Sequence, residues 1–177
     1  MYPNIALTGR SGAGKTTVAG YLAEHYRYAI ASTGTVCREV CGILFGSQSK
    51  TVMNQVTDAM RALDESVWMS AALRRVPAGR PVVVDAARFK PDMELLRARG
   101  FVFWRVEAPL AECVRRLSER GQEFSLGVDD IHSSETEWAQ WPADVAIANH
   151  GPIHEELYRL VEAALNTDTK VVAAHEP

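Results

Sequence analysis

The segment Gly9-Arg10-Ser11-Gly12-Ala13-Gly14-Lys15-Thr16 decides the fold, because it matches the phosphate-binding pattern G-x-x-x-x-G-K-[ST] in full. Its flanks agree with this interpretation. Residues 4–8 form a short apolar run typical of a buried strand, and residues 17–26 carry apolar side chains at helical spacing. A strand, a glycine-rich loop and a helix in this order indicate a nucleoside triphosphate site rather than a chance glycine-rich turn.

Each residue type in this loop has a chemical reason. Glycines adopt backbone conformations closed to other residues, so the loop N–H groups can turn inward on phosphates at the positive end of the following helix. Lys15 would neutralise charge on the β- and γ-phosphates of ATP, and the Thr16 hydroxyl would bind the bridging Mg²⁺. The expected ATP contacts in this region are Gly9, Ser11, Gly12, Ala13, Gly14, Lys15, Thr16 and Thr17.

Length, charge and cysteine content narrow the class of protein. The 177 residues and 47% hydrophobic content fit a single domain, expected over residues 1–166 with a frayed tail at 167–177. A net charge of -3 gives no overall basic field, so extended nucleic-acid binding has no electrostatic support. Three cysteines with no secretory signal and no long apolar run favour the cytoplasm and no membrane segment. A homodimer stays open.

Short apolar runs alternate with helical patterns along the chain. This alternation predicts an α/β fold, a five-stranded parallel sheet flanked by helices with the usual strand order 2-3-1-4-5. The candidate strands are residues 4–8, 28–32, 81–85, 101–107 and 144–148. The candidate helices after the first are one long or broken helix over 52–71 and helices over 91–100, 109–121 and 153–164, after which the pattern is lost.

The longest stretch without a predicted strand or long helix is 121–142. Such a long irregular segment in a compact domain is usually functional or mobile, so we predict a lid there. Ser134 and Glu137 within it form a capping box that would open a short helix ended by Pro142, and a capping role alone is the favoured interpretation of both residues. No role is assigned to His132.

A second motif follows the second predicted strand. Residues 32–38, Ser-Thr-Gly-Thr-Val-Cys-Arg, resemble the S-T-G-x-x-x-R segment of adenylate kinase and related nucleoside monophosphate kinases. This resemblance implies that Thr33 contacts the acceptor nucleotide and Arg38 its phosphate, within a helical acceptor-binding region over 33–76. The alternative is that Thr33 caps the next helix and Arg38 is a solvated surface charge.

Asp85 and Arg88 stand at the end of the third predicted strand. Open α/β sheets bind ligands beyond the carboxyl ends of their strands, which makes this a suitable place for a second substrate. Asp85 would hold a water on Mg²⁺ or contact the acceptor, and Arg88 would grip the acceptor phosphate with two hydrogen bonds. Alternatively, the two side chains pair only with each other.

Arg116 and Arg120 lie four residues apart and therefore share one helix face beside the predicted lid. The pair is similar to the R-x-x-x-R at the lid entrance of monophosphate kinases, where arginines stabilise the charge of the transferring phosphoryl group. The catalytic set that we expect is Lys15, Arg88, Arg116 and Arg120, with Arg116 also contacting ATP. For Arg115, which precedes the pair, the competing interpretation is that its side chain lies on a solvated face of the helix.

Several weaker motifs narrow the resemblance to phage-type deoxynucleoside monophosphate kinases. If the chain is encoded by a phage, its expected location is the cytoplasm of the host. They are residues 84–89, 132–135, 144–151 and 156–157. Two departures stand out: Ala86 occupies the place where that family carries an aspartate, which puts the Mg²⁺ role of Asp85 in doubt, and residues 122–157 contain no Lys or Arg, which implies a short, arginine-poor lid.

The loop after the last predicted strand is where this family places the donor adenine. Asn149 and Gly151 are therefore included among the expected ATP contacts. Asn149 would either hydrogen-bond the adenine or satisfy its own turn, and the turn is the favoured interpretation.

The favoured reaction is phosphoryl transfer from ATP, with Mg²⁺, to a (deoxy)nucleoside monophosphate. Such an acceptor needs no strong general base, because the second pKa of a phosphate is about 6 and the group is largely ionised near pH 7. A hydroxyl kinase similar to dephospho-coenzyme A kinase would need a carboxylate base, and residues 32–35 offer none, although Asp85 keeps this alternative open. A nucleotide-dependent switch or accessory ATPase is the third alternative.

Overall fold

The computed structural model of the chain describes residues 2–121, 136–151 and 154–173. Five strands form one sheet in the order β2-β3-β1-β4-β5, and every pairing is parallel, which confirms the predicted architecture. The strands are β1 (Ile5–Thr8), β2 (Ala29–Ala31), β3 (Val82–Val84), β4 (Val102–Glu107) and β5 (Val145–Ala148). Each lies inside its predicted range, shortened by one or two residues.

The helices follow the strands as the sequence predicts, with one difference at the last helix. They are α1 (Lys15–Tyr26), α2 (Thr33–Phe45), α3 (Lys50–Arg61), α4 (Val67–Arg74), α5 (Lys90–Ala98), α6 (Leu110–Glu119), the 3-10 helix η1 (Glu137–Gln140) and α8 (His154–Ala173). Of the two alternatives for residues 52–71, the broken helix is confirmed, as α3 and α4 are separated where the Asp64 carboxylate accepts a hydrogen bond from the Ser66 backbone N–H at 2.9 Å. The last helix continues to Ala173, past the point where the apolar pattern is lost.

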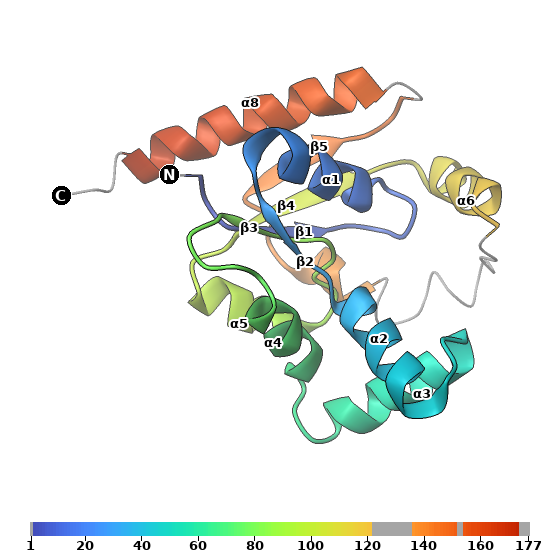
Figure 1. Ribbon diagram of the computed structural model, residues 1–177. Coiled ribbons are helices and arrows are strands. Elements are labelled where there is room, and N and C mark those ends of the chain that lie inside the picture. The colour runs from blue at the N-terminus through green and yellow to red at the C-terminus, as the bar shows by residue number, and fades with distance from the viewer. Residues whose placement is uncertain (1, 122–135, 152–153, 174–177) are drawn as a thin grey trace.

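Helices cover both faces of the sheet, with α1 and α8 on one side and α4 and α5 on the other (Figure 1). The central strand β1 serves both faces, because successive side chains of a strand point to opposite sides. Ile5 and Leu7 pack with α1 and α8, whereas Ala6 packs in the cluster that contains α4 and α5. All four residues of β1 are buried, as expected for a parallel strand covered on both faces.

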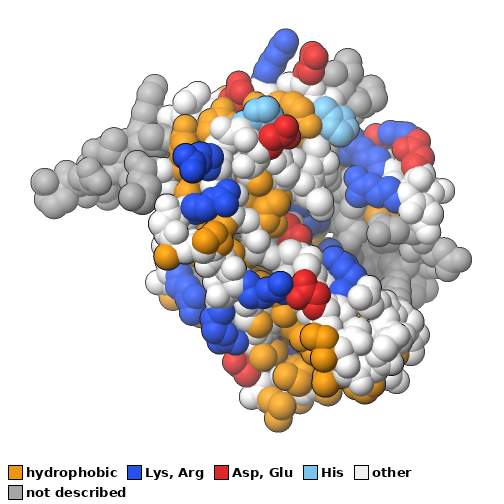
Figure 2. Space-filling model, viewed as in Figure 1, with side chains coloured by type: hydrophobic (Ala, Val, Ile, Leu, Met, Phe, Trp, Pro, Cys, Tyr) orange, Lys and Arg blue, Asp and Glu red, His pale blue; other side chains and the backbone are white. Residues whose placement is uncertain are grey.

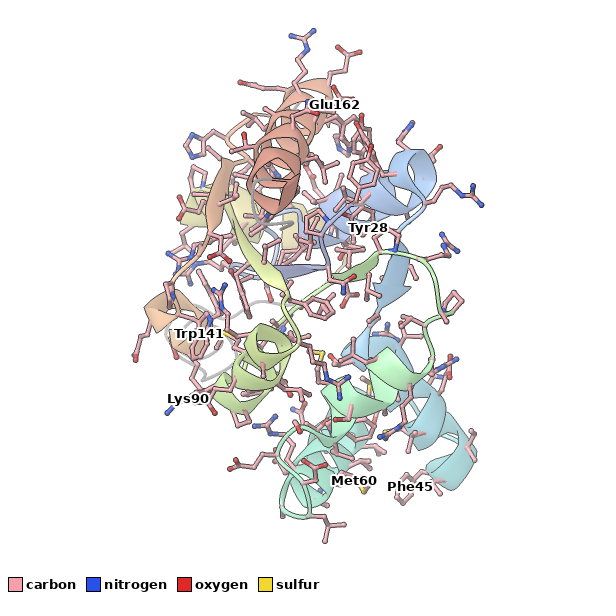
Figure 3. The ribbon with its side chains drawn as sticks, turned by 90° about the vertical axis from the view of Figure 1, so that its left-hand side faces the viewer. Tyr28, Phe45, Met60, Lys90, Trp141 and Glu162 are labelled. Atoms are coloured by element: carbon pink, nitrogen blue, oxygen red, sulfur yellow. The ribbon has the colours of Figure 1, made fainter. Side chains whose placement is uncertain are left out.

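Helices α2 and α3 extend away from the sheet. Figure 3 shows Phe45 and Met60 at the far tip of this pair, and Phe45 is exposed. The pair belongs to the predicted acceptor-binding region over 33–76, so the fold sets that region beside the carboxyl ends of β2 and β3.

The predicted capping box is only partly within the described residues. Ser134 lies outside them, as do His132 and residues 122–135 of the predicted lid. Glu137 begins η1, and its Oε2 accepts a hydrogen bond from the Lys90 backbone N–H at 3.1 Å. The Glu137 carboxylate thus binds the start of α5. The N-cap residue of α5 is Phe89, whose side chain has no oxygen that could accept a hydrogen bond there. Figure 3 shows Lys90 beside Trp141, the residue that follows η1.

The packing of α5 on the sheet gives a test of the core. Leu96 is fully buried, and we predict that Leu96→Ala lowers the free energy of unfolding by about 2–5 kcal/mol, through lost burial and the cavity left behind. Leu63→Ala, at a side chain that is 81% exposed, is the matched control and should change stability little. Denaturant unfolding of both variants measures this, and equal destabilisation would contradict the described packing.

Candidate active site

The glycine-rich loop between β1 and α1 is packed against three other parts of the fold. Gly9, Gly12 and Gly14 have φ angles of 131°, 80° and 107°, in the region that side-chain-bearing residues rarely adopt. A Cβ on them would lie 2.2 Å from the Val106 carbonyl oxygen, 2.5 Å from that of Cys113 and 2.4 Å from Asn149 Nδ2, respectively. Glycine is therefore required at all three positions by backbone conformation and by close contact with β4, α6 and the residue after β5.

Lys15 folds over this loop. Its Nζ donates hydrogen bonds to the backbone carbonyl oxygens of Gly9 at 2.7 Å and Arg10 at 2.8 Å, and the side chain is buried. No described side chain caps the start of α1, so the positive end of the helix faces the loop without a carboxylate partner. Thr16 is exposed in the first turn of the same helix. An anion entering the loop would meet a positive charge, helix N–H groups and a hydroxyl.

The carboxyl edge of β2 and β3 brings together residues from separate motifs. The backbone continues the sheet past β3, with Asp85 N–H donating to the Ala31 carbonyl oxygen at 3.2 Å. Burial raises the pKa of Asp85, while a hydrogen bond from Ser32 and the positive charges of Arg88, Lys15 and Arg38 lower it. The charges of three cations, Arg88, Lys15 and Arg38, therefore act on Asp85.

The start of α2 corrects one prediction about the second motif. Ser32, not Thr33, is the N-cap, and its Oγ accepts hydrogen bonds from the Thr35 backbone N–H at 3.3 Å and the Thr35 hydroxyl at 3.1 Å. Thr33 is the first residue of the helix. Arg38 is exposed and donates to Thr35 Oγ1 at 3.3 Å, which holds its guanidinium near the helix start.

The two arginines of α6 lie beside the loop, as their spacing predicts. Arg116 and Arg120 both line a cavity of about 380 Å³, together with Gly14, Thr17, Arg115, Glu119, Asn149, Gly151, His154 and Leu157. The Arg116 guanidinium donates to the carbonyl oxygens of Gly12 at 3.4 Å and Gly151 at 3.0 Å. Figure 2, in the view of Figure 1, shows Lys and Arg side chains beside Asp and Glu side chains on the right, where α6 lies. Arg116 thus links the glycine-rich loop to the loop after β5.

Glu112 fixes the direction of the basic side chains on α6. Hydrogen bonds from Arg115, together with the charge of Arg116, lower the pKa of Glu112 to about 2, so this carboxylate stays ionised. Its Oε1 lies 2.9 Å from Arg116 Nε. Arg115 also pairs with Glu119. Because Arg115 is half exposed but also lines the cavity, the interpretation as a solvated face is only partly right.

Asn149 has a role that the sequence did not reveal. Its side chain is 8% exposed, and Nδ2 donates a hydrogen bond to the Ala13 carbonyl oxygen at 2.7 Å. The Asn149 amide therefore binds the glycine-rich loop. The interpretation that we favoured, in which it satisfies its own turn, is wrong. The two residues are 136 positions apart, so no local pattern could have indicated their contact.

Asp92 is a second residue that no pattern in the sequence singled out. It lies in α5 with 5% exposure, and its Oδ2 is 3.8 Å from Arg61 of α3, whose guanidinium stacks over Phe89 at 4.0 Å. Oδ1 is buried with no hydrogen-bond partner among the described residues. Burial raises the pKa of Asp92 to about 7, against the opposing effect of Arg61.

Together with the strand order, the loop after β1 places the chain among the P-loop proteins, the class that binds nucleoside triphosphates at a glycine-rich turn. Residues 5–137 match the family described as an AAA domain, and the chain belongs to that family. No helix among the described residues is long and apolar enough to cross a membrane.

Comparison with individual proteins agrees with this assignment. A cytidylate kinase from Exiguobacterium sibiricum is 33% identical over 121 residues, which cover 66% of this chain and 52% of that protein. The chain thus spans about half the length of the curated relative that it matches.

Solved structures share the fold along nearly the whole chain. A shikimate kinase from Acinetobacter baumannii in complex with shikimate has a TM-score of 0.62 at 16% identity, and the match covers 100% of this chain and 97% of that one. A gluconokinase from Sinorhizobium meliloti 1021 has a TM-score of 0.56 at 18% identity, covering 93% and 94%. These likenesses confirm the fold.

The raised pKa of Asp92 predicts a pH dependence of stability. Between its ordinary value near 4 and about 7, the folded protein holds a proton that the unfolded chain has lost, so this group lowers stability as pH rises through that window. Asp92→Asn removes this titration. We therefore expect the stability of the variant relative to wild type to increase from pH 5 to pH 8 in denaturant unfolding, whereas a constant difference would contradict the assignment.

Proposed function

We propose that the protein is an ATP-dependent kinase that transfers the γ-phosphoryl group to a (deoxy)nucleoside monophosphate. The observation that carries this proposal is that Lys15, Arg88 and Arg38, which follow three neighbouring parallel strands, all act on the charge of Asp85 at the edge where those strands end. Lys15 belongs to the loop for the donor phosphates, whereas the two arginines come from the ends of β2 and β3. A protein that only hydrolysed ATP would have no need of a second set of cations there.

The donor site in this proposal is the glycine-rich loop with the cavity beside it. Phosphates would be held by the loop N–H groups and Lys15, and the base would lie in the cavity lined by Arg116, Gly151 and Leu157. The adenine would lie against Arg116, which already contacts the loop after β5. Arg120 lines the same cavity, and we assign it to the phosphates.

The residues near the loop fit a magnesium ion. Mg²⁺ prefers oxygen ligands and keeps several waters, and Thr16 offers an exposed hydroxyl while Asp85 offers a carboxylate within reach of Lys15. Within the described part of the chain, no cluster of three or more His, Cys, Asp or Glu side chains could hold a metal unaided, so phosphate oxygens would complete the set. When bound, Mg²⁺ neutralises charge on the β- and γ-phosphates.

The chain's own residues then supply position and charge. Arg38 and Arg88 would orient the acceptor phosphate so that its oxygen faces the γ-phosphoryl group, and Thr33 would contact the acceptor nucleotide at the start of α2. Lys15, Arg116 and Arg120 would stabilise the negative charge in the transition state. Because the acceptor phosphate is already ionised, no side chain has to remove a proton.

The 33% identity to a cytidylate kinase supports a monophosphate acceptor. The narrower resemblance to phage-type deoxynucleoside monophosphate kinases and a lid over 121–142 are parts of this proposal that rest on the sequence alone.

A hydroxyl kinase is the second candidate, and one observation favours it. The raised pKa of Asp85 would suit a general base beside a hydroxyl acceptor, and several proteins of similar fold are named as shikimate kinases or a gluconokinase. Three cations around Asp85 favour the phosphate acceptor, since a base assisting a hydroxyl needs fewer positive charges near it.

The acceptor class can be tested directly with purified protein, ATP and Mg²⁺. Each ribo- and deoxyribonucleoside monophosphate is added separately, with shikimate and gluconate as hydroxyl acceptors, and ADP formation is measured. We expect ADP to form only with one or a few monophosphates. Turnover with a hydroxyl acceptor alone would support the second candidate, and ADP formation without any acceptor would support an ATPase.

Lys15→Ala should lower the rate of transfer on the order of 10²-fold or more, because the ammonium that stabilises the transferring charge is lost. Lys90→Ala removes a lysine charge at an exposed position outside the site and should leave the rate unchanged. Steady-state kinetics at saturating ATP make the comparison. Near-wild-type turnover by Lys15→Ala would contradict the catalytic assignment.

Arg88→Ala and Arg38→Ala should raise the KM for the monophosphate far more than the KM for ATP. Arg88→Lys should restore only part of the loss, because a lysine cannot form the paired hydrogen bonds of a guanidinium. Arg99→Ala, at an exposed arginine just after α5, is the control. Equal increases in both KM values would argue against an acceptor-phosphate role.

A further inference from the structure

The peptide unit between Ala13 and Gly14 is fixed by a side chain from the far end of the chain. Asn149 Nδ2 donates to the Ala13 carbonyl oxygen at 2.7 Å, and this hydrogen bond is buried. In a planar trans peptide the carbonyl oxygen and the following N–H point in opposite directions. Holding the Ala13 oxygen toward Asn149 therefore turns the Gly14 N–H to the opposite side of the loop.

This peptide precedes a residue whose backbone has wide conformational freedom, so a contact that holds its carbonyl oxygen restricts its orientation. Gly14 has a φ of 107° and no side chain, and glycine populates several backbone regions at similar energy. Gly12, two positions earlier, is also in the left-handed region. The Ala13 N–H donates to the Arg10 carbonyl oxygen at 3.1 Å, and the Ala13 oxygen accepts from Asn149.

Asn149 is itself held rigidly. Its backbone N–H donates to the Glu107 carbonyl oxygen at 2.7 Å, which extends the pairing of β4 with β5 by one residue. Its backbone oxygen accepts from Arg116 at 3.4 Å. A Cβ on Gly14 would lie 2.4 Å from Asn149 Nδ2, so the amide is packed directly against the loop. Through Asn149, the sheet thereby fixes the position of the Ala13 carbonyl group in the loop.

We propose that Asn149 is a positioning residue that sets the Ala13–Gly14 peptide for phosphate binding. Its amide donates to Ala13, and the loop N–H groups then face the phosphates. This inference rests on ATP binding in the proposed function, but it does not depend on which acceptor is used. A failed acceptor assignment and a failed role for Asn149 therefore give different results.

The test compares Asn149→Asp and Asn149→Ala with wild type at pH 8. Asp is nearly isosteric but presents an ionised oxygen to the Ala13 carbonyl, and Ala leaves that carbonyl without a donor. The Kd for ATP with Mg²⁺ should rise about ten-fold or more in both variants. Asn166→Asp makes the same chemical change at an exposed position in α8 and should leave the Kd unchanged.

A pH series separates positioning from simple damage. When the carboxyl of Asn149→Asp is protonated it regains a donor, and burial beside a carbonyl raises its pKa above the ordinary value near 4. ATP affinity of this variant should therefore recover, relative to wild type, as pH falls from 8 to 5. Asn149→Ala has no such group and should not recover.

Two results would overturn the proposal. One is a Kd for ATP within two-fold of wild type in both variants at pH 8. The other is a loss of ATP affinity in Asn149→Asp that does not change with pH and is matched by an equal loss of affinity for the acceptor, since a general disturbance of the fold would affect both sites. Selective, pH-reversible loss of ATP affinity would support it.

Discussion

Close backbone contact at the three loop glycines is the constraint on which the rest of the structure depends. Gly9 lies against β4, Gly12 against α6 and Gly14 against Asn149, each closer than a side chain would permit. The conformation of the loop is therefore set by contacts with β4, α6 and the residue after β5, which come together only in the folded protein. The backbone N–H groups of the loop can then bind a ligand on its other side. The rigidity of an otherwise flexible glycine-rich turn is supplied by tertiary packing.

The parallel sheet explains how the charges come together. All five strands end at one edge, so Lys15 after β1, Arg38 after β2 and Arg88 after β3 converge although they are far apart in the sequence. Asp85 in their midst offsets part of this positive charge. In the proposed function, the cations near Asp85 would hold a second phosphate next to the first, because two like-charged substrates must be neutralised before they can approach each other.

The sequence was sufficient for the fold because its signals were local. The loop motif, the apolar runs and the prolines and glycines at helix ends predicted all five strands and their order. The spacing of Arg116 and Arg120 alone predicted that they share one face of a helix, and both line the same cavity. Asn149 and Asp92 were missed because their contacts, with Ala13 and Arg61, join distant parts of the chain. Ser32 takes the place of Thr33 as the cap because the helix begins at Thr33, one residue earlier than a Thr33 cap would require.

The bond formed in the reaction tests the central claim most directly. Phosphorus NMR of the protein with ATP, Mg²⁺ and the preferred monophosphate shows where the γ-phosphoryl group goes. Transfer to a phosphate acceptor predicts the coupled resonances of a nucleoside diphosphate, growing together with those of ADP. A phosphate monoester formed on a hydroxyl, or inorganic phosphate alone, would contradict the account.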